Sequence, residues 1–397
     1  MRPEESLFLG LLRDHVQRSS STAAPLGTDW EALFRFAEEQ GLSGVCYAQL
    51  KELNAKGKPV PGETLERFHE AFFSVVYTAV NQRAAMASIG EQFREAGLRF
   101  LPFKGWVIRR SWPIPELRTM GDVDILIRSV DREKSDEILL GMGYRKKVDH
   151  QAVWAYYTED LMFELHDHMF YDPMPNGVDY CGFFDRAWDY AAPDLDESFH
   201  FLYLITHLAK HTVEKGMGFR AYLDLVFFCG ACRERLRWDW IQDKLEELKL
   251  LRFTETCFAL CRAWFGFESP FPIGELDPGF YDFVTNKLFR DGVFGLGNAQ
   301  NEASRSAKEI TRRKGPYWLR SLGLMLYRVF PPYGDLELVP WYSFLKGRPW
   351  LLPAAWVYRW YYCLRHKREK GAALLLEPIR KRDVIEQRQR IIRDWGI

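Results

Sequence analysis

Two aspartates in the run Gly121-Asp122-Val123-Asp124 have the spacing of a metal-binding pair. The apolar residues around them predict a β-strand, and a strand sends residues i and i+2 to the same face. Asp122 and Asp124 are therefore expected to project together. Carboxylate oxygens are ligands that Mg²⁺ takes, usually beside waters and nucleotide phosphates. Because Asp-x-Asp alone also occurs in turns and solvated strand edges, the neighbouring segments decide its interpretation.

The segment ahead of this pair has the features of a phosphate-binding turn. Leu98 to Phe103 predicts a short apolar strand, Lys104-Gly105 follows it, and Trp106 to Trp112 predicts a helical turn. A glycine at such a junction lets the backbone approach a ligand, and the N–H groups that open the next helix suit a phosphate. The order of parts is therefore a strand, a glycine turn, a short helix and a strand with two aspartates.

This order resembles the nucleotidyltransferase superfamily, whose pattern is a Gly-Gly or Gly-Ser turn, an Asp-x-Asp pair and a third acidic residue on a later strand. More narrowly, the chain looks like the bacterial family of uncharacterised nucleotidyltransferases that carries Lys-Gly in place of Gly-Ser. The motifs that carry this likeness span roughly residues 98–224 and are Leu101-Pro-Phe-Lys-Gly105, Leu117-Arg-Thr-Met-Gly-Asp-Val-Asp-Ile-Leu-Ile127, Gly143-Tyr144 and Phe163-Glu-Leu-His166.

The resemblance implies which residues contact the nucleotide. Trp106 stands where many superfamily members have a phosphate-binding serine, so phosphate contact falls to the Gly105 backbone, Lys104 and Arg118, with Gly121 beside the metal pair. Arginine offers a bidentate fork to phosphate, and lysine offers a point charge.

A third carboxylate is expected in the run Leu161 to His168. Phe163 and Leu165 alternate with Glu164 and His166 as in a half-buried strand, which places Glu164 and His166 on one face. We prefer Glu164 as the third metal ligand or general base, with Asp167 on the opposite face as its rival. His166 is expected to hydrogen-bond a carboxylate or the substrate phosphate, because two histidines, His166 and His168, without a third spaced ligand are a weak signal for zinc.

The resemblance then implies a reaction. Asp122, Asp124 and Glu164 would hold Mg²⁺, in a two-ion site with Mn²⁺ as an alternative, and an NMP group would pass from an NTP such as ATP to an acceptor. The acceptor is open among a small molecule, a glycan or lipid intermediate, a protein and a tRNA. Two other interpretations remain open: a catalytically silent nucleotide-binding or scaffolding module of the same fold, and a kinase-like phosphotransferase.

The resemblance also implies an α+β fold, with a small mixed-sheet nucleotidyltransferase palm embedded in mostly helical N- and C-terminal regions. Apolar positions at three- and four-residue spacing predict helices through the first region, with Thr28 or Asp29 as an N-cap. The predicted regions are a helical N-terminal region (1–96), the palm (97–172), a helical domain (173–300) and a helical, aromatic and basic C-terminal region (301–397).

The stretch Ser198 to Cys232 predicts helix with polar residues on single faces. His207 and His211 stand at i and i+4, and Arg220 and Asp224 repeat that spacing. Similar residues occur in the family, which implies a wall beside the acceptor, with His207, Arg220 and Asp224 touching substrate or the site's outer shell. The alternative is a helix–helix interface with satisfied polar groups.

The composition of the whole chain sets broader limits. Its net charge is zero, which disfavours nucleic acid as a partner without excluding it, and no run has the length of a membrane span. The seven scattered cysteines indicate a reducing cytoplasm, and Cys229-Gly-Ala-Cys232 lacks the second pair of a zinc site. Tryptophans and tyrosines interleave with basic residues between 341 and 365. This mixture suits helix core, contact with a membrane surface, binding of an anionic glycan or lipid carrier, or stacking on single-stranded RNA.

Overall fold

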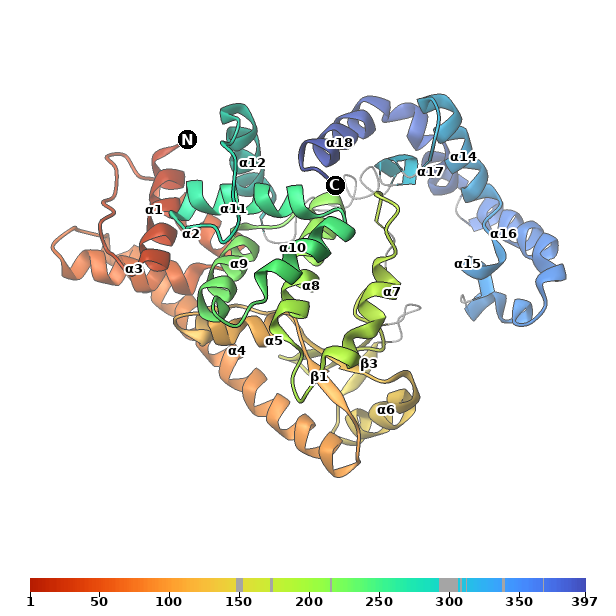
Figure 1. Ribbon diagram of the computed structural model, residues 1–397, viewed down its shortest axis with the longest axis horizontal. Helices are drawn as coiled ribbons and strands as arrows, with labels where there is room; N and C mark the ends of the chain where they lie inside the picture. Colours follow the sequence, from red (N-terminus) through yellow and green to blue (C-terminus); the bar gives the residue numbers. More distant parts are fainter. Residues whose placement is uncertain are drawn as a thin grey trace. The chain divides into compact units, whose positions relative to one another are not determined.

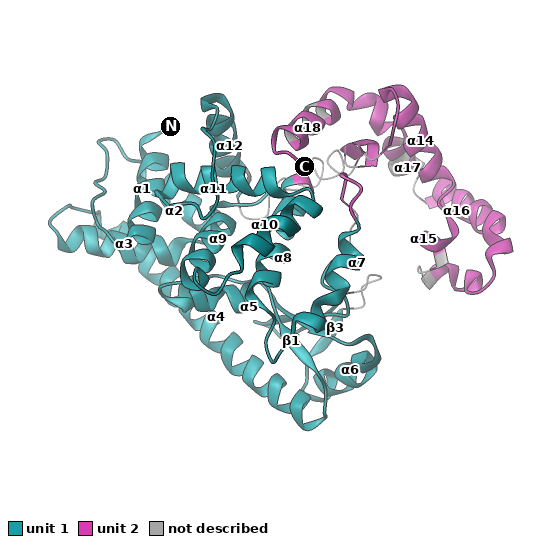
Figure 2. Ribbon diagram, in the orientation of Figure 1, with its two compact units in different colours: residues 1–172, 179–212, 216–295 teal, residues 173–178, 213–215, 296–397 magenta. Residues whose placement is uncertain are grey.

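The computed structural model describes residues 1–147, 153–171, 174–214, 216–292, 306–307, 309–311, 313–337, 340–366 and 368–397. The described chain has an α+β fold that consists of one small mixed sheet and many helices (Figure 1). It divides into two compact units (Figure 2): unit 1 comprises residues 1–172, 179–212 and 216–295, and unit 2 comprises 173–178, 213–215 and 296–397. The four regions predicted from the sequence divide the chain more finely and stay a prediction.

The sheet of unit 1 has five strands in the order β1-β2-β5-β4-β3. β2 and β5 are parallel neighbours, whereas the pairs β1–β2, β5–β4 and β4–β3 are antiparallel. The run Gln151 to Thr158 predicts a strand, and the structure shows one over Val153–Tyr157, while residues 151–152 lie outside the described chain. The strands are β1 (Phe100–Pro102), β2 (Val123–Ile127), β3 (Arg145–Lys147), β4 (Val153–Tyr157) and β5 (Met162–His166).

The pleat of β2 and β5 separates an apolar face from a polar face. Val123, Ile125 and Ile127 of β2 are buried on one side, together with Phe163 and Leu165 of β5. Helices α4 (Gly62–Glu95) and α6 (Arg132–Gly141) supply the opposing apolar side chains, which are Met86, Ile89, Phe93 and Leu139. Because successive side chains of a strand alternate, Asp124, Glu164 and His166 are left for the other face.

The N-terminal helices form where apolar spacing predicts them. Asp29 is the N-cap of α2, and its side chain accepts a hydrogen bond from the Ala32 N–H at 3.0 Å. The long helix α4 ends at Glu95, and Gly97, with a φ of 72°, turns the chain toward β1. The helices before the sheet are α1 (Pro3–Gln17), α2 (Trp30–Glu39), α3 (Ser43–Ala55) and α4.

Two helices that follow the sheet carry several predicted site residues. The structure divides the predicted helical stretch 198–232 into α8 (Glu197–Glu214) and α9 (Phe219–Cys232). Gly216 has a φ of 92°, a conformation that glycine adopts without steric cost, and Gly218 is the N-cap of α9. The other helices of unit 1 are α5 (Gly105–Ile108), α6, α7 (Tyr180–Phe184), α10 (Trp238–Glu247), α11 (Leu251–Phe265) and α12 (Pro278–Asp291).

Unit 2 consists of helices in its described part. The indole N–H groups of Trp356 and Trp360 donate to the carbonyls of Pro331 and Val329 at 2.8 and 2.9 Å, which ties α16 to the end of α14. Among the described residues, none of the helices combines the length and the apolar character that a bilayer-spanning segment needs. The helices are α14 (Tyr317–Val329), α15 (Tyr333–Glu337), α16 (Leu352–His366), α17 (Arg368–Arg380) and α18 (Arg382–Asp394).

Candidate active site

The polar face of the β2–β5 pair brings together carboxylates from two distant segments. In the parallel register Asp124 lies opposite Glu164, and Leu126 lies opposite His166. Asp122 directly precedes β2 and is partly buried. A parallel pair thus places side by side residues that are separated in the chain by a helix and two strands.

Asp124 is the best-connected residue of this group. Its Oδ1 accepts from Lys104 Nζ at 2.5 Å and lies 2.8 Å from His166 Nε2. Burial by itself would raise the pKa of Asp124, which is only 4% exposed, but Lys104 and His166 outweigh it and lower the pKa to about 2. Asp124 is therefore held as a carboxylate at neutral pH.

Asp122 has the opposite electrostatic environment. Burial raises its pKa to about 6, and the charges of Asp124 and Glu164 act in the same direction, while Lys104 and His166 offset part of the effect. Three carboxylates thus crowd one end of the sheet, and a cation between them would relieve their repulsion.

The donor set fits a divalent cation. Ligand atoms of Asp124, Glu164 and His166 all lie within 4.8 Å of one another, and Glu164 Oε2 is 3.4 Å from His166 Nε2. The two bonds to Asp124 both end on Oδ1, which leaves Oδ2 for another partner. Carboxylate oxygens suit Mg²⁺, and one imidazole nitrogen adds affinity for Mn²⁺.

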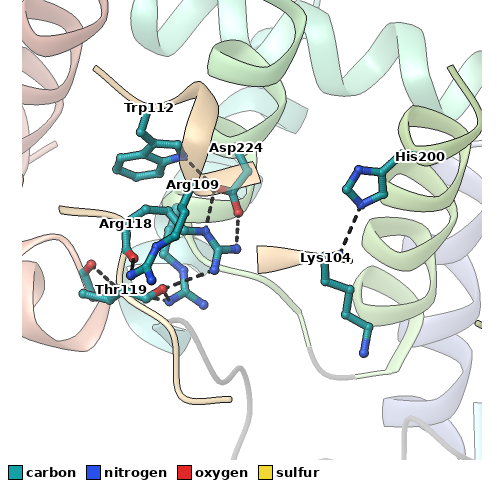
Figure 3. A network of polar contacts seen from close by, with 9 residues as sticks. Lys104, Arg109, Trp112, Arg118, Thr119, His200 and Asp224 are labelled. Carbon is teal, nitrogen blue, oxygen red and sulfur yellow. Dashed lines mark hydrogen bonds and ion pairs between the residues drawn. The ribbon is translucent and has the colours of Figure 1, made fainter. Parts of the chain in front are cut away.

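Lys104 reaches Asp124 from a strained turn. Its φ of 49° and ψ of −128° form a conformation that a residue with a side chain rarely adopts. The buried His200 Nε2 accepts the Lys104 backbone N–H at 3.2 Å, as Figure 3 shows. Tyr203, also on α8, is buried, and burial raises the pKa of its hydroxyl although the nearby charge of Lys104 acts to lower it. His200 of α8 therefore holds the backbone of Lys104, and Asp124 of β2 holds its ammonium group.

A buried ion pair supports the glycine turn. Arg118 binds Asp224 through two contacts, Nε to Oδ1 at 3.1 Å and Nη2 to Oδ2 at 2.7 Å, and Trp112 Nε1 donates to the same carboxylate at 2.9 Å (Figure 3). A Cβ added to Gly105 would lie 2.2 Å from Arg118 Nη1. Gly105 is thus required by the close approach of this guanidinium.

Two more arginines surround the Arg118–Asp224 pair. Arg220 donates to the Thr119 carbonyl and hydroxyl, and Arg109 Nη2 donates to the Arg118 carbonyl at 3.4 Å. Burial lowers the pKa of Arg109 and of Arg220 to about 10, and the charge of Arg118 adds to it. The arginines Arg109, Arg118 and Arg220 form a cationic cluster close to the carboxylates, since the charge of Asp122 acts to raise the pKa of Arg220.

The described geometry gives each predicted site residue a definite place. It brings Asp124, Glu164 and His166 to metal-ligand spacing, with Lys104 bound to Asp124. Asp122 lies outside that group of three and is linked to it by the mutual effect of their charges. Gly121 is exposed, and a Cβ added to it would meet no heavy atom within 4 Å, so the space above it is open. Arg118 and Asp224 are committed to each other. Their contacts with substrate stay predictions.

His207 is half-buried and lies beside a second histidine of α8. Its Nε2 is 3.1 Å from His211 Nε2, and burial, the neighbouring His211 and the charge of Lys104 hold its pKa well below the usual range. His207 is therefore neutral at neutral pH.

The rival candidates have other partners. Asp167 Oδ2 pairs with Arg132 Nη1 at 2.9 Å, and His168 Nδ1 lies 2.6 Å from Asp185 Oδ1. Among the described residues, the group of His, Cys, Asp and Glu with metal-ligand spacing contains Glu164 and not Asp167. Burial raises the pKa of both Cys229 and Cys232, so these thiols on α9 are protonated and unreactive.

His200 and Tyr203 are site residues to which the sequence analysis gave no role. A signal for them exists in the sequence: His200, Tyr203, His207 and His211 follow one another at three- and four-residue spacing in a helix whose central part is mostly apolar. Such a stripe of polar rings marks the face of α8 that contacts Phe103 and Lys104 in the turn after β1.

Comparison with known proteins adds one finding. A family model described as an uncharacterised nucleotidyltransferase matches residues 27–266, which include the whole sheet, the acidic cluster, and helices α8 and α9. The comparisons with curated proteins and with solved structures give no match.

Proposed function

Because the chain belongs to this family of uncharacterised nucleotidyltransferases, we propose that it transfers an NMP group from an NTP such as ATP to an acceptor, with Mg²⁺ held by Asp122, Asp124 and Glu164. Mn²⁺ is a second suitable ion, because His166 adds a nitrogen ligand. The observation that carries the proposal is the parallel register of β2 and β5, which sets Asp124 opposite Glu164. Bound metal would stabilise the charge that builds on the phosphates.

The chain's own residues prepare the site for a polyphosphate. Lys104 holds Asp124 ionised and leaves a cation at the turn where the phosphates are proposed to bind. The open space above Gly121 gives the nucleotide room beside the carboxylates. Asp224 keeps Arg118 against Gly105, which holds the turn in shape.

The proposed reaction is a displacement at the α-phosphorus. An acceptor oxygen forms a bond to the α-phosphorus. The bond between the α-phosphorus and the oxygen that bridges it to the β-phosphate breaks, and pyrophosphate leaves with the electron pair of that bond. If the acceptor is a hydroxyl, its proton passes to Glu164, which is partly exposed on the polar face of the sheet. The acceptor class stays open, and a reducing cytoplasm is the proposed compartment, because the seven cysteines are scattered along the chain and odd in number.

The test uses purified protein, Mg²⁺ and α-³²P-labelled NTPs, alone and with cell extract. Wild type should transfer label, and Asp122→Asn/Asp124→Asn should lose it by at least about a thousandfold, since the charges that position the reacting groups are gone. The matched control is Glu159→Gln/Asp160→Asn, which neutralises two exposed carboxylates on the turn between β4 and β5. Label transfer by the aspartate variant at the wild-type rate would refute the site.

Labelling the γ-phosphate separates the competing chemistries. Transfer of γ-label without α-label would assign phosphotransfer instead, because a different phosphorus is attacked. Nucleotide binding with no transfer of either label would assign the catalytically silent module.

A further inference from the structure

The C-terminal part of the chain is strongly basic although the whole chain is neutral. Residues 296–397, nearly all of unit 2, contain 20 Lys and Arg against 9 Asp and Glu, a net charge of +11. The preceding residues therefore carry −11. Glu377 is buried and pairs with Arg328 and Lys381, so it adds no negative charge to the surface. Basic residues that are exposed in this unit include Lys314, Lys346, Arg348, Arg365 and Arg380.

Helix α14 presents an apolar stripe to solvent. Trp318, Leu322, Leu326 and Phe330 recur every four residues from its first turn to its C-cap, and each is exposed. The opposite side of the helix carries the buried Leu324, which packs in the interior of the unit. Both faces of α14 are thus apolar, and only one of them is covered in the described part of unit 2.

Helix α16 and the segment before it repeat this pattern with more aromatic rings. Val357, Tyr361 and Leu364 lie at i, i+4 and i+7 and are 60%, 59% and 68% exposed. Ahead of the helix, Trp341 and Trp350 are exposed on either side of Lys346 and Arg348. Large apolar side chains rarely gather on a solvent-facing surface without a partner.

The two exposed stripes belong to one folded body. Phe330, which ends the α14 stripe, packs on Trp356 and Trp360 of α16 with ring centroids 5.2 and 5.1 Å apart. Both indoles also bond to backbone carbonyls at the end of α14. The exposed apolar residues are therefore held on a fixed helical scaffold, drawn in magenta in Figure 2.

From this surface we infer that unit 2 binds the face of an anionic lipid bilayer, with the exposed apolar residues of α14 and α16 entering the interface and the basic residues meeting the headgroups. Single-stranded nucleic acid would use the aromatic rings and the cations but gives no role to Leu322, Leu326, Val357 and Leu364. A second copy of the unit would bring two charges of +11 together. This inference stands independently of the proposed reaction.

The test is co-sedimentation of the full chain with lipid vesicles. Vesicles of phosphatidylcholine with roughly 30% phosphatidylglycerol should bind the protein at about 0.1 M salt and release much of it near 1 M, and pure phosphatidylcholine should bind it far less. Trp318→Ser/Leu326→Ser/Tyr361→Ser should weaken binding by at least about tenfold. The matched control is Phe73→Ser/Tyr77→Ser/Leu140→Ser, which removes three exposed apolar side chains from unit 1.

A second measurement reports on insertion itself. Brominated acyl chains in the anionic vesicles should quench tryptophan fluorescence of wild type, and less so in the triple variant of unit 2. Equal binding by both triple variants, or no binding to anionic vesicles at low salt, would overturn the inference. Capture of poly(U) with no vesicle binding would also overturn it and assign the surface to nucleic acid.

Discussion

At the scale of single residues, the negative charge of Asp122 lowers the stability of the folded protein when no metal is bound. The folded pKa of Asp122, about 6, lies above the ordinary value of 3.8, because partial burial and the charges of Asp124 and Glu164 raise it while Lys104 and His166 only partly compensate. A carboxyl with a raised pKa favours folding when protonated, so its contribution is complete below about pH 4 and is lost as the pH rises through about 6.

Asp122→Asn should therefore stabilise the metal-free protein above about pH 6. We expect a gain of roughly 1–3 kcal/mol at about pH 7.5 and little change at about pH 4, measured by urea unfolding in EDTA. Asp160→Asn, at an exposed turn, is the control and should change stability little at either pH. A loss of stability at the higher pH would contradict the electrostatic account.

Asp224 is expected to be a stability residue as well as a site residue. Its removal leaves the buried Arg118 without its bidentate partner and Trp112 Nε1 without an acceptor. Asp224→Ala should destabilise the protein by about 3–5 kcal/mol in denaturant unfolding. Asp189→Ala breaks an exposed pair with Arg186 and should cost about 0–1 kcal/mol; equal losses in the two variants would count against a buried ion pair.

At the scale of elements, the turn between β1 and α5 depends on a missing side chain. Gly105→Ala would place a Cβ 2.2 Å from Arg118 Nη1 and 2.7 Å from Met120 Sδ, so the guanidinium must move. We expect a loss of about 1–3 kcal/mol of folding free energy, together with reduced label transfer.

Gly141→Ala is the matched control for this glycine. Gly141 ends α6, and no heavy atom lies within 4 Å of its Cβ position, so alanine should be neutral or stabilising by up to about 1 kcal/mol. Tolerance of Gly105→Ala to the same degree would show that the turn does not need the close approach of Arg118.

The elements that local pattern specifies could be predicted from the sequence, and the contacts between distant elements could not. Asp29 was predictable as an N-cap because its partner lies three residues away. The alternation of apolar and polar residues around Glu164 predicted a strand on which Glu164 and His166 share a face. The structure pairs this strand with β2, as the hypothesis of a shared site required. The family and the α+β fold followed from motifs, and both are confirmed.

Side chains that meet across long separations gave no local signal. Arg118 and Asp224 are 106 positions apart, and Lys104 N–H and His200 are 96 apart. Nothing near Arg118 in the sequence distinguishes a phosphate-binding arginine from one buried against a carboxylate. The unusual backbone of Lys104 was equally unreadable, because a lysine there predicts no positive φ.

At the scale of the whole molecule, metal binding should couple the site to global stability. An ion held between Asp122, Asp124 and Glu164 in the folded state alone stabilises it by about 2.7 kcal/mol at a free concentration of about 100 times Kd. Mg²⁺ or Mn²⁺ should thus raise the thermal midpoint of wild type. The midpoint of Asp122→Asn/Asp124→Asn should stay constant, and a rise equal to that of wild type would place the ion elsewhere.

The strand order has a consequence for how the chain is made. β5 lies between β2 and β4, yet it is the last of the five strands to be synthesised. Until Met162–His166 leaves the ribosome, β2 can pair only with β1, and its other edge stays open to neighbouring chains. The nascent protein therefore passes through an interval in which Asp122 and Asp124 are already present without Glu164, and β5 both closes the vulnerable edge and completes the acidic cluster in one event.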